Sequence, residues 1–228
     1  MINKYEMNEA LGSFLNSIEI SHLFARDYRH GIETPNGWDM FEPTRFIYAF
    51  FAFNMIYEID WHETMKKGIL QKHNSYVLNA KAQMDELTKF LWADGSCGFE
   101  SALLQFDREK ELFSDISLLD ADKNSNRPST KNKSKLISEV FKESSKKFSC
   151  GLALTIEDHF NLLEMSYAVR NNIFHGNKKA TKMKENGHRK RLFHYGNIIL
   201  ATNETFFELL RNSFSYCRVQ NYEVVDNQ

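Results

Sequence analysis

Arginine, asparagine and histidine side chains stand close together in the chain at positions 170, 171 and 175. An imidazole takes up a proton near neutral pH, a guanidinium holds a phosphate through two parallel hydrogen bonds, and an amide orients that phosphate. These are the groups that phosphodiester cleavage without a metal ion requires. The sequence therefore predicts Arg170, Asn171 and His175 as catalytic residues, with no metal and no cofactor.

The three residues fall at the end of a helix that the apolar pattern predicts for residues 155–176, with Gly176 as its stop. Asn171 and His175 share one face of a straight helix, whereas Arg170 and His175 are about 140° apart. We expect that the long arginine swings round, that His175 leaves from a loosened last turn, or that a second copy of the helix completes the site across a two-fold axis.

The run Arg-Asn-Asn-Ile-Phe-His at 170–175 resembles the R-x4-6-H signature of the HEPN superfamily (higher eukaryotes and prokaryotes nucleotide-binding), and the apolar run 46–58 is similar to an earlier core helix of those proteins. The resemblance implies a four-helix core and a homodimer that brings two motifs together. It also implies RNA cleavage in a toxin–antitoxin, phage-defence or RNA-processing system, with a separate antitoxin protein as a further partner. In antitoxin-linked members a tyrosine follows two residues after the histidine, where this chain has Asn177, so that subclass is not indicated.

The composition favours helices over strands. The 228 residues include 42% hydrophobic residues and 19 Phe, but only 3 Pro and 10 Gly, so helix punctuation is sparse. We expect an all-α bundle in a single HEPN-like domain over 1–228, with core helices at about 42–66, 155–176 and 189–216. Further helices are predicted at 6–25, 72–92, 99–119 and 137–148, and Thr155 with Asp158 resembles a capping box at the start of the motif helix.

Charge in this chain is local rather than global. The net charge is −1, so the protein is no general polyanion binder. The stretch 177–191 carries seven basic residues against one acidic residue, a balance of +6, and it predicts RNA-phosphate contacts from Lys178, Lys179, Lys182 and Arg189. Residues 120–135, with five basic against two acidic residues, are predicted to be a flexible basic insertion, either a solvated linker or a further phosphate contact.

Asn54 and Glu58 interrupt a helix that is otherwise apolar almost all round. A buried amide without a partner costs about 1–3 kcal/mol and an unpaired charge costs more, so both should have partners. They either cap neighbouring helix ends or reach the rim, or one of them supports the site by fixing Arg170 or the tautomer of His175.

Three cysteines form no C-x-x-C pair, which indicates a reducing compartment. No signal-peptide core and no run of about 18 apolar residues occurs, so we expect a cytoplasmic protein that does not enter a membrane. The acidic and histidine cluster at 60–63 has no second His or Cys at ligand spacing, and it does not predict a metal site.

Two functions compete. The first is a metal-independent endoribonuclease in which the RNA 2′-hydroxyl attacks the phosphate. The second is a non-catalytic helical module that binds RNA or protein, in which Arg170 pairs with Glu58 or Glu164 and His175 caps its helix. Nucleotide binding without cleavage is a third. An arginine and histidine open to a groove favour chemistry, whereas burial of both against carboxylates favours a scaffold.

Overall fold

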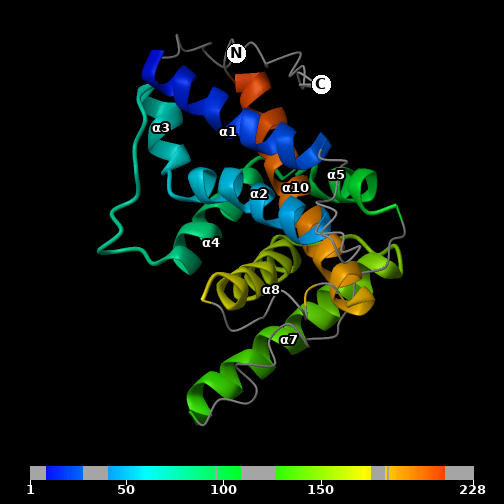
Figure 1. Cartoon of the computed structure of the whole chain (residues 1–228). Coiled ribbons are helices and arrows are strands. Elements are labelled where there is room, and N and C mark those ends of the chain that lie inside the picture. The colour runs from blue at the N-terminus through cyan, green and yellow to red at the C-terminus, as the bar shows by residue number, and fades with distance from the viewer. Residues whose placement is uncertain are drawn as a thin grey trace.

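The structure is a computed structural model, and it describes residues 9–27, 41–95, 97–108, 127–175, 183 and 185–213. These residues form helices joined by turns and loops, with one isolated bridge between Ile59 and Lys72, so the predicted all-α class is confirmed. The described helices, labelled in Figure 1, are α1 (Glu9–Asp27), α2 (Phe41–Tyr57), α3 (Trp61–Lys67), α4 (Ala80–Leu91), α5 (Phe99–Phe106), α7 (Pro128–Ser149), α8 (Ile156–Phe174) and α10 (Asn186–Ser213).

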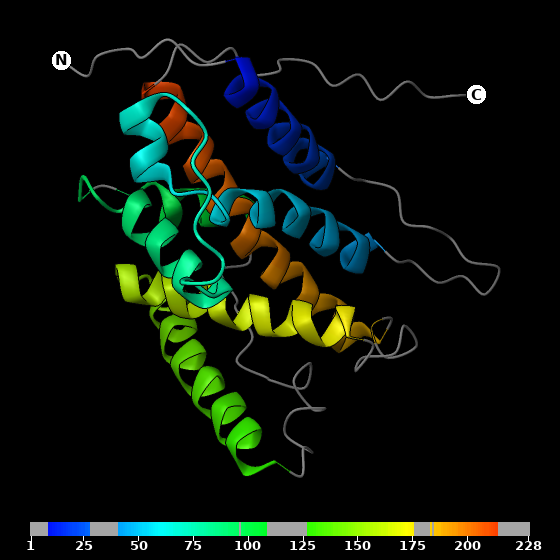
Figure 2. The same cartoon turned by 90° about the vertical axis from the view of Figure 1, so that its left-hand side faces the viewer.

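The core forms where α10 packs against α2, α5 and α8, and where α1 packs against α2. Helix α2 is apolar on most sides and buries Phe46, Phe50 and Phe53 completely, as expected for a central helix. Both views place α1 toward one end of the molecule and α7 at the other, with α2 and α8 between them (Figure 1 and Figure 2). Helix α8 is therefore the element that joins the core to the projecting α7.

A break separates α2 from α3, although the sequence predicts one core element over about 42–66. Asp60 caps α3 by accepting a hydrogen bond from the Glu63 N–H, and the indole N–H of Trp61 donates to the carbonyl of Ile56 at 2.7 Å. Both contacts satisfy backbone groups that a helix end leaves open. The chain therefore turns at 58–60 without leaving these groups unpaired.

The sequence predicts a flexible insertion over residues 120–135, but residues 128–135 form the first two turns of α7. The prediction is therefore wrong for this part of the segment. Pro128 occupies the start of the helix, where its missing N–H costs nothing. The buried stripe of α7 uses serines beside apolar residues, among them Ser134, Ser138 and Ser145, so hydropathy alone does not reveal it. Residues 120–126 lie outside the described part of the chain.

Two other helices differ from their predicted ends. Helix α4 begins at Ala80 rather than near 72, because the Asn79 side chain accepts from the Ala82 N–H and caps it. Helix α5 ends at Phe106, where Asp107 turns inward, is fully buried and accepts a hydrogen bond from His194 Nδ1. Residues 109–119, predicted to continue that helix, lie outside the described residues.

The start of α8 is as predicted. Thr155 Oγ1 accepts from the Asp158 N–H, and the Asp158 carboxylate accepts from the Thr155 N–H, which completes the capping box. The helix ends at Phe174 with His175 at its C-cap. None of the described helices has the length and apolar character needed to span a bilayer.

Candidate functional site

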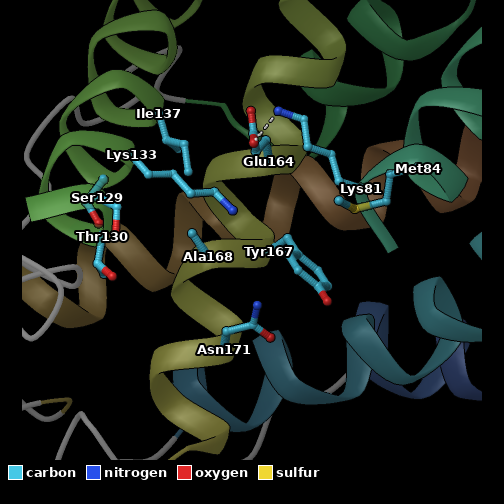
Figure 3. A pocket seen from close by; sticks show the side chains of 11 residues that line it. Lys81, Met84, Ser129, Thr130, Lys133, Ile137, Glu164, Tyr167, Ala168 and Asn171 are labelled. Carbon is cyan, nitrogen blue, oxygen red and sulfur yellow. Dashed lines mark hydrogen bonds and ion pairs between the residues drawn. The ribbon is translucent and has the colours of Figure 1, made fainter. Parts of the chain in front are cut away.

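One face of α8 lines a cavity, and Asn171 is the catalytic candidate that belongs to its lining. Glu164, Ala168 and Asn171 follow the spacing of one helical stripe and line a cavity of about 370 Å³. His175 continues this stripe one turn beyond Asn171. The cavity lies between α8, the start of α4 and the first turns of α7, and Figure 3 shows its lining side chains converging from these three helices.

Arg170 is turned toward Asn171. Its Nη1 donates to Asn171 Oδ1 at 3.0 Å, and its guanidinium carbon lies 4.6 Å from the Phe174 ring centroid and 5.9 Å from that of Tyr167. These contacts draw the cation round the helix, as expected for a long side chain. Arg170 and Asn171 are therefore brought together, but the arginine is turned toward Asn171 and not toward His175, so the predicted meeting of Arg170 with His175 stays a prediction.

The hydrogen bond from Arg170 also determines what Asn171 offers to the cavity. Because Asn171 Oδ1 accepts from the guanidinium, the amide NH₂ group remains as a donor. Figure 3 shows the nitrogen of this amide on the side of Ala168 and Tyr167, within the cavity. Asn171 is thus a bridge between the Arg170 cation and the cavity.

His175 is exposed at the C-cap of α8. Its backbone N–H donates to the Asn171 carbonyl at 2.9 Å, which fixes its position directly after the last helical turn. No contact joins the His175 side chain to the side chain of Arg170 or Asn171 among the described residues, and His175 meets Asn171 through the backbone alone. The imidazole is exposed and is therefore accessible from solvent.

Arg170 meets no carboxylate within the described residues. Glu164 is engaged with Lys81 Nζ at 2.7 Å, and Glu58 is exposed in the turn after α2. The ion pair that the non-catalytic hypothesis expects for Arg170, with Glu58 or Glu164, is therefore not formed. Within the described ranges, the guanidinium is held by an amide and two aromatic rings, none of which carries a negative charge.

Tyr57 on α2 completes the surroundings of the arginine. Burial raises the pKa of Tyr57 to about 12, Tyr167 adds to this effect, and the nearby Arg170 charge opposes it. The Tyr57 and Tyr167 rings meet edge to face at 6.4 Å. Tyr57 therefore stays a neutral phenol at physiological pH.

The predicted supporting residues do not contact the site. No hydrogen bond joins Asn54 or Glu58 to Arg170 or His175 in the described part of the chain. Asn54 is half-buried on α2, and its Oδ1 has no hydrogen-bond partner among the described residues.

The predicted phosphate-binding residues divide into two groups. Lys178, Lys179 and Lys182 lie outside the described residues. Arg189 donates to both carboxylate oxygens of Glu42, at 2.9 and 3.2 Å, and so ties α10 to the start of α2. Arg189 thus has a structural role as the partner of Glu42, and its contact with an RNA phosphate stays a prediction.

Three polar cavity residues were not anticipated from the sequence, namely Lys81, Ser129 and Thr130, and Lys133 was considered only as part of the basic segment 120–135 that could contact phosphate. They come from α4 and α7, far from the motif in sequence, and no spacing rule connects them with α8. Tyr167 was expected only as a core residue. The signal that could have found it is the helical stripe that leads back from Asn171.

The remaining reactive side chains have structural roles. In the 60–63 cluster, Asp60 caps α3 and Glu63 pairs with Lys67 at 3.0 Å. Burial raises the pKa of Cys97 to about 11, so it remains a thiol. Within the described ranges, no three His, Cys, Asp or Glu side chains gather closely enough to hold a metal ion.

In comparisons with known proteins, no family model, no curated protein and no solved structure matches the chain.

Proposed function

We propose that this protein is a metal-independent endoribonuclease whose site is Arg170, Asn171 and His175. The observation that carries the proposal is the Arg170 guanidinium, which is held by the Asn171 amide without a carboxylate among the described residues, while His175, one turn after Asn171, is exposed. Arg189, in contrast, meets the carboxylate of Glu42.

In the proposed reaction the RNA 2′-oxygen attacks the adjacent phosphorus. The P–O2′ bond forms, the P–O5′ bond breaks, and the products carry a 2′,3′-cyclic phosphate and a 5′-hydroxyl. His175 takes the proton from the 2′-hydroxyl or gives one to the 5′-oxygen, Arg170 neutralises the charge that develops on phosphorus oxygens, and Asn171 orients the phosphate. A homodimer, which the HEPN resemblance implies, would supply the second proton-transfer group from the other copy.

The test is cleavage of a labelled RNA in the presence of EDTA. We expect the wild-type protein to cut RNA and to leave the same sequence uncut when it is made of DNA. His175→Ala should lower the rate by about 10²- to 10⁴-fold, because one proton transfer is lost. Arg170→Ala should lower it by about 10²- to 10³-fold, the typical cost of losing one group that stabilises developing charge.

His62→Ala is the matched control, because it removes an exposed imidazole from α3, outside the site, and should cut at the wild-type rate. Equal cutting by wild type and His175→Ala would refute catalysis by this site. RNA that is bound by both proteins but cut by neither would support the non-catalytic RNA-binding module instead.

The proposed toxin or phage-defence role predicts that expression of the wild-type protein arrests growth when no antitoxin is supplied, and that expression of the His175→Ala variant does not.

A further inference from the structure

We propose that the cavity between α4, α7 and α8 binds the RNA nucleotide next to the bond that is cut, with Lys133 as the ligand of its phosphate. This inference rests on the proposed function for the position of the cut, but the cavity and its charges are independent of that function. The cavity volume of about 370 Å³ lies within the range of small-molecule sites, which runs from about 300 to 1,000 Å³.

The charge in the cavity suits one phosphodiester. Lys81 and Lys133 contribute two positive charges and Glu164 one negative charge, so two minus one leaves +1. Lys81 is already neutralised by Glu164 at 2.7 Å, whereas Lys133 meets no carboxylate in the described part of the chain. A phosphodiester carries one negative charge, and Lys133 is the cation available to match it.

The other polar groups of the cavity can donate hydrogen bonds to a phosphate or ribose oxygen. Ser129 and Thr130 present hydroxyls from the first turn of α7, and Asn171 presents its amide nitrogen (Figure 3). Figure 3 also shows Lys133 reaching from α7 toward α8, above Asn171. The Tyr167 ring lines the same space and provides an apolar surface on which a base can stack.

The cavity is continuous with the catalytic residues through Asn171. This residue accepts from Arg170 on one side and lines the cavity on the other. From Asn171 back to Glu164 is seven residues, or about 10 Å along the helix axis, which is room for a single nucleotide. A phosphate at Arg170 and its neighbour at Lys133 would therefore belong to consecutive nucleotides of one strand.

The experiment measures binding of an RNA oligonucleotide whose 2′-hydroxyls are all methylated, so that it cannot be cut. Lys133→Ala should weaken binding by about threefold to tenfold at low salt, and should reduce the slope of log K against log salt by about 0.7, the value for one lost contact to a single strand. Lys135→Ala is the matched control. It removes a lysine that is also exposed on α7, two residues away but outside the cavity, and should leave both quantities at wild-type values.

Two further measurements extend the experiment. The first distinguishes binding of a free mononucleotide from binding of an RNA strand, and the second distinguishes failure of the nucleotide site from failure of the proposed catalysis. A mononucleotide that binds as tightly as the oligonucleotide, and depends on Lys133, would overturn the assignment to an RNA strand. If unmethylated RNA is cut at the normal rate by the wild type, while the Lys133→Ala and Lys135→Ala variants bind the methylated oligonucleotide equally tightly, the inference fails and the proposed function stands. If nothing is cut but Lys133→Ala alone weakens binding, the nucleotide site stands and the proposed catalysis fails.

Discussion

His159 and His175 sit on the same helical segment and differ in the properties on which proton transfer depends. His159 is completely buried, and its ring stacks on Phe99 with centroids 3.6 Å apart. The indole of Trp92 can only donate, so the His159 Nδ1 that it contacts at 3.0 Å must accept, and Nε2 carries the proton and donates to Thr202. His159 is thus a neutral core residue, and His175 is the exposed imidazole at this helix.

His159 should make the folded state sensitive to acid. Burial lowers the pKa of His159 to about 3, whereas the unfolded chain has the ordinary value of about 6.5. Below pH 6.5 the unfolded chain binds a proton that the folded one excludes, so stability is fully present above that pH and falls as pH decreases. We expect this residue to contribute a slope of up to about 1.4 kcal/mol per pH unit between about pH 6 and 3.

Urea unfolding at several pH values measures that slope. His159→Gln has no group that titrates in this range, and its unfolding free energy should fall less steeply from pH 6 to 4 than that of the wild type. Parallel curves for the two proteins would contradict a neutral buried imidazole.

At the scale of the element, the orientation of α8 depends on its first turn. Burial disfavours the charged form of Asp158, but hydrogen bonds from Lys147, Thr155 and Ser144 outweigh it and hold the pKa of Asp158 below its ordinary value. Lys147 and Ser144 belong to α7. The same carboxylate therefore caps α8 and fixes it to α7, the helix that supplies Lys133 to the cavity.

Thr155→Ala removes the side-chain acceptor of the capping box and should lower the free energy of unfolding by about 1 kcal/mol. Thr155→Ser retains the hydroxyl and is the matched control, expected to stay close to the wild type. Urea denaturation of the three proteins measures the difference. Equal losses for the alanine and serine variants would mean that the cap hydrogen bond does not stabilise α8.

At the scale of the whole molecule, the site depends on three helices that meet only in the fold. α8 supplies the catalytic candidates and one wall of the cavity, and α4 and α7 supply its lysines and hydroxyls. The chain has 29 basic and 30 acidic residues, so its surface as a whole does not attract RNA. Binding must come from the few cations that are not already paired with carboxylates.

The salt dependence of RNA binding should therefore be shallow. With two to four phosphate contacts, including Arg170 and Lys133, the slope of log K against log salt for single-stranded RNA should lie between about −1.4 and −2.8. Titration of the methylated oligonucleotide at several salt concentrations measures it. A slope steeper than about −5 would indicate an extended basic surface and contradict a binding site confined to the α8 cavity.

Much of α8 could be predicted from the sequence because its contacts are local. The capping box joins residues three apart, and the helix end and the common face of Asn171 and His175 follow from the 3.6-residue repeat. The apolar run of α2 likewise identified a central helix. Such patterns depend on neighbouring residues, and tertiary packing did not overrule them.

The tertiary structure alone decided which cations can serve the site. Arg189, in the most basic stretch, is neutralised by Glu42 from a helix far away in sequence, whereas Lys133, from a stretch predicted to be a flexible insertion, lines the cavity. The direction of the Arg170 side chain, in contrast, is set within α8, by Asn171, Phe174 and Tyr167. Charge and spacing show which groups a chain has, but only packing between distant helices decides which of them are already paired.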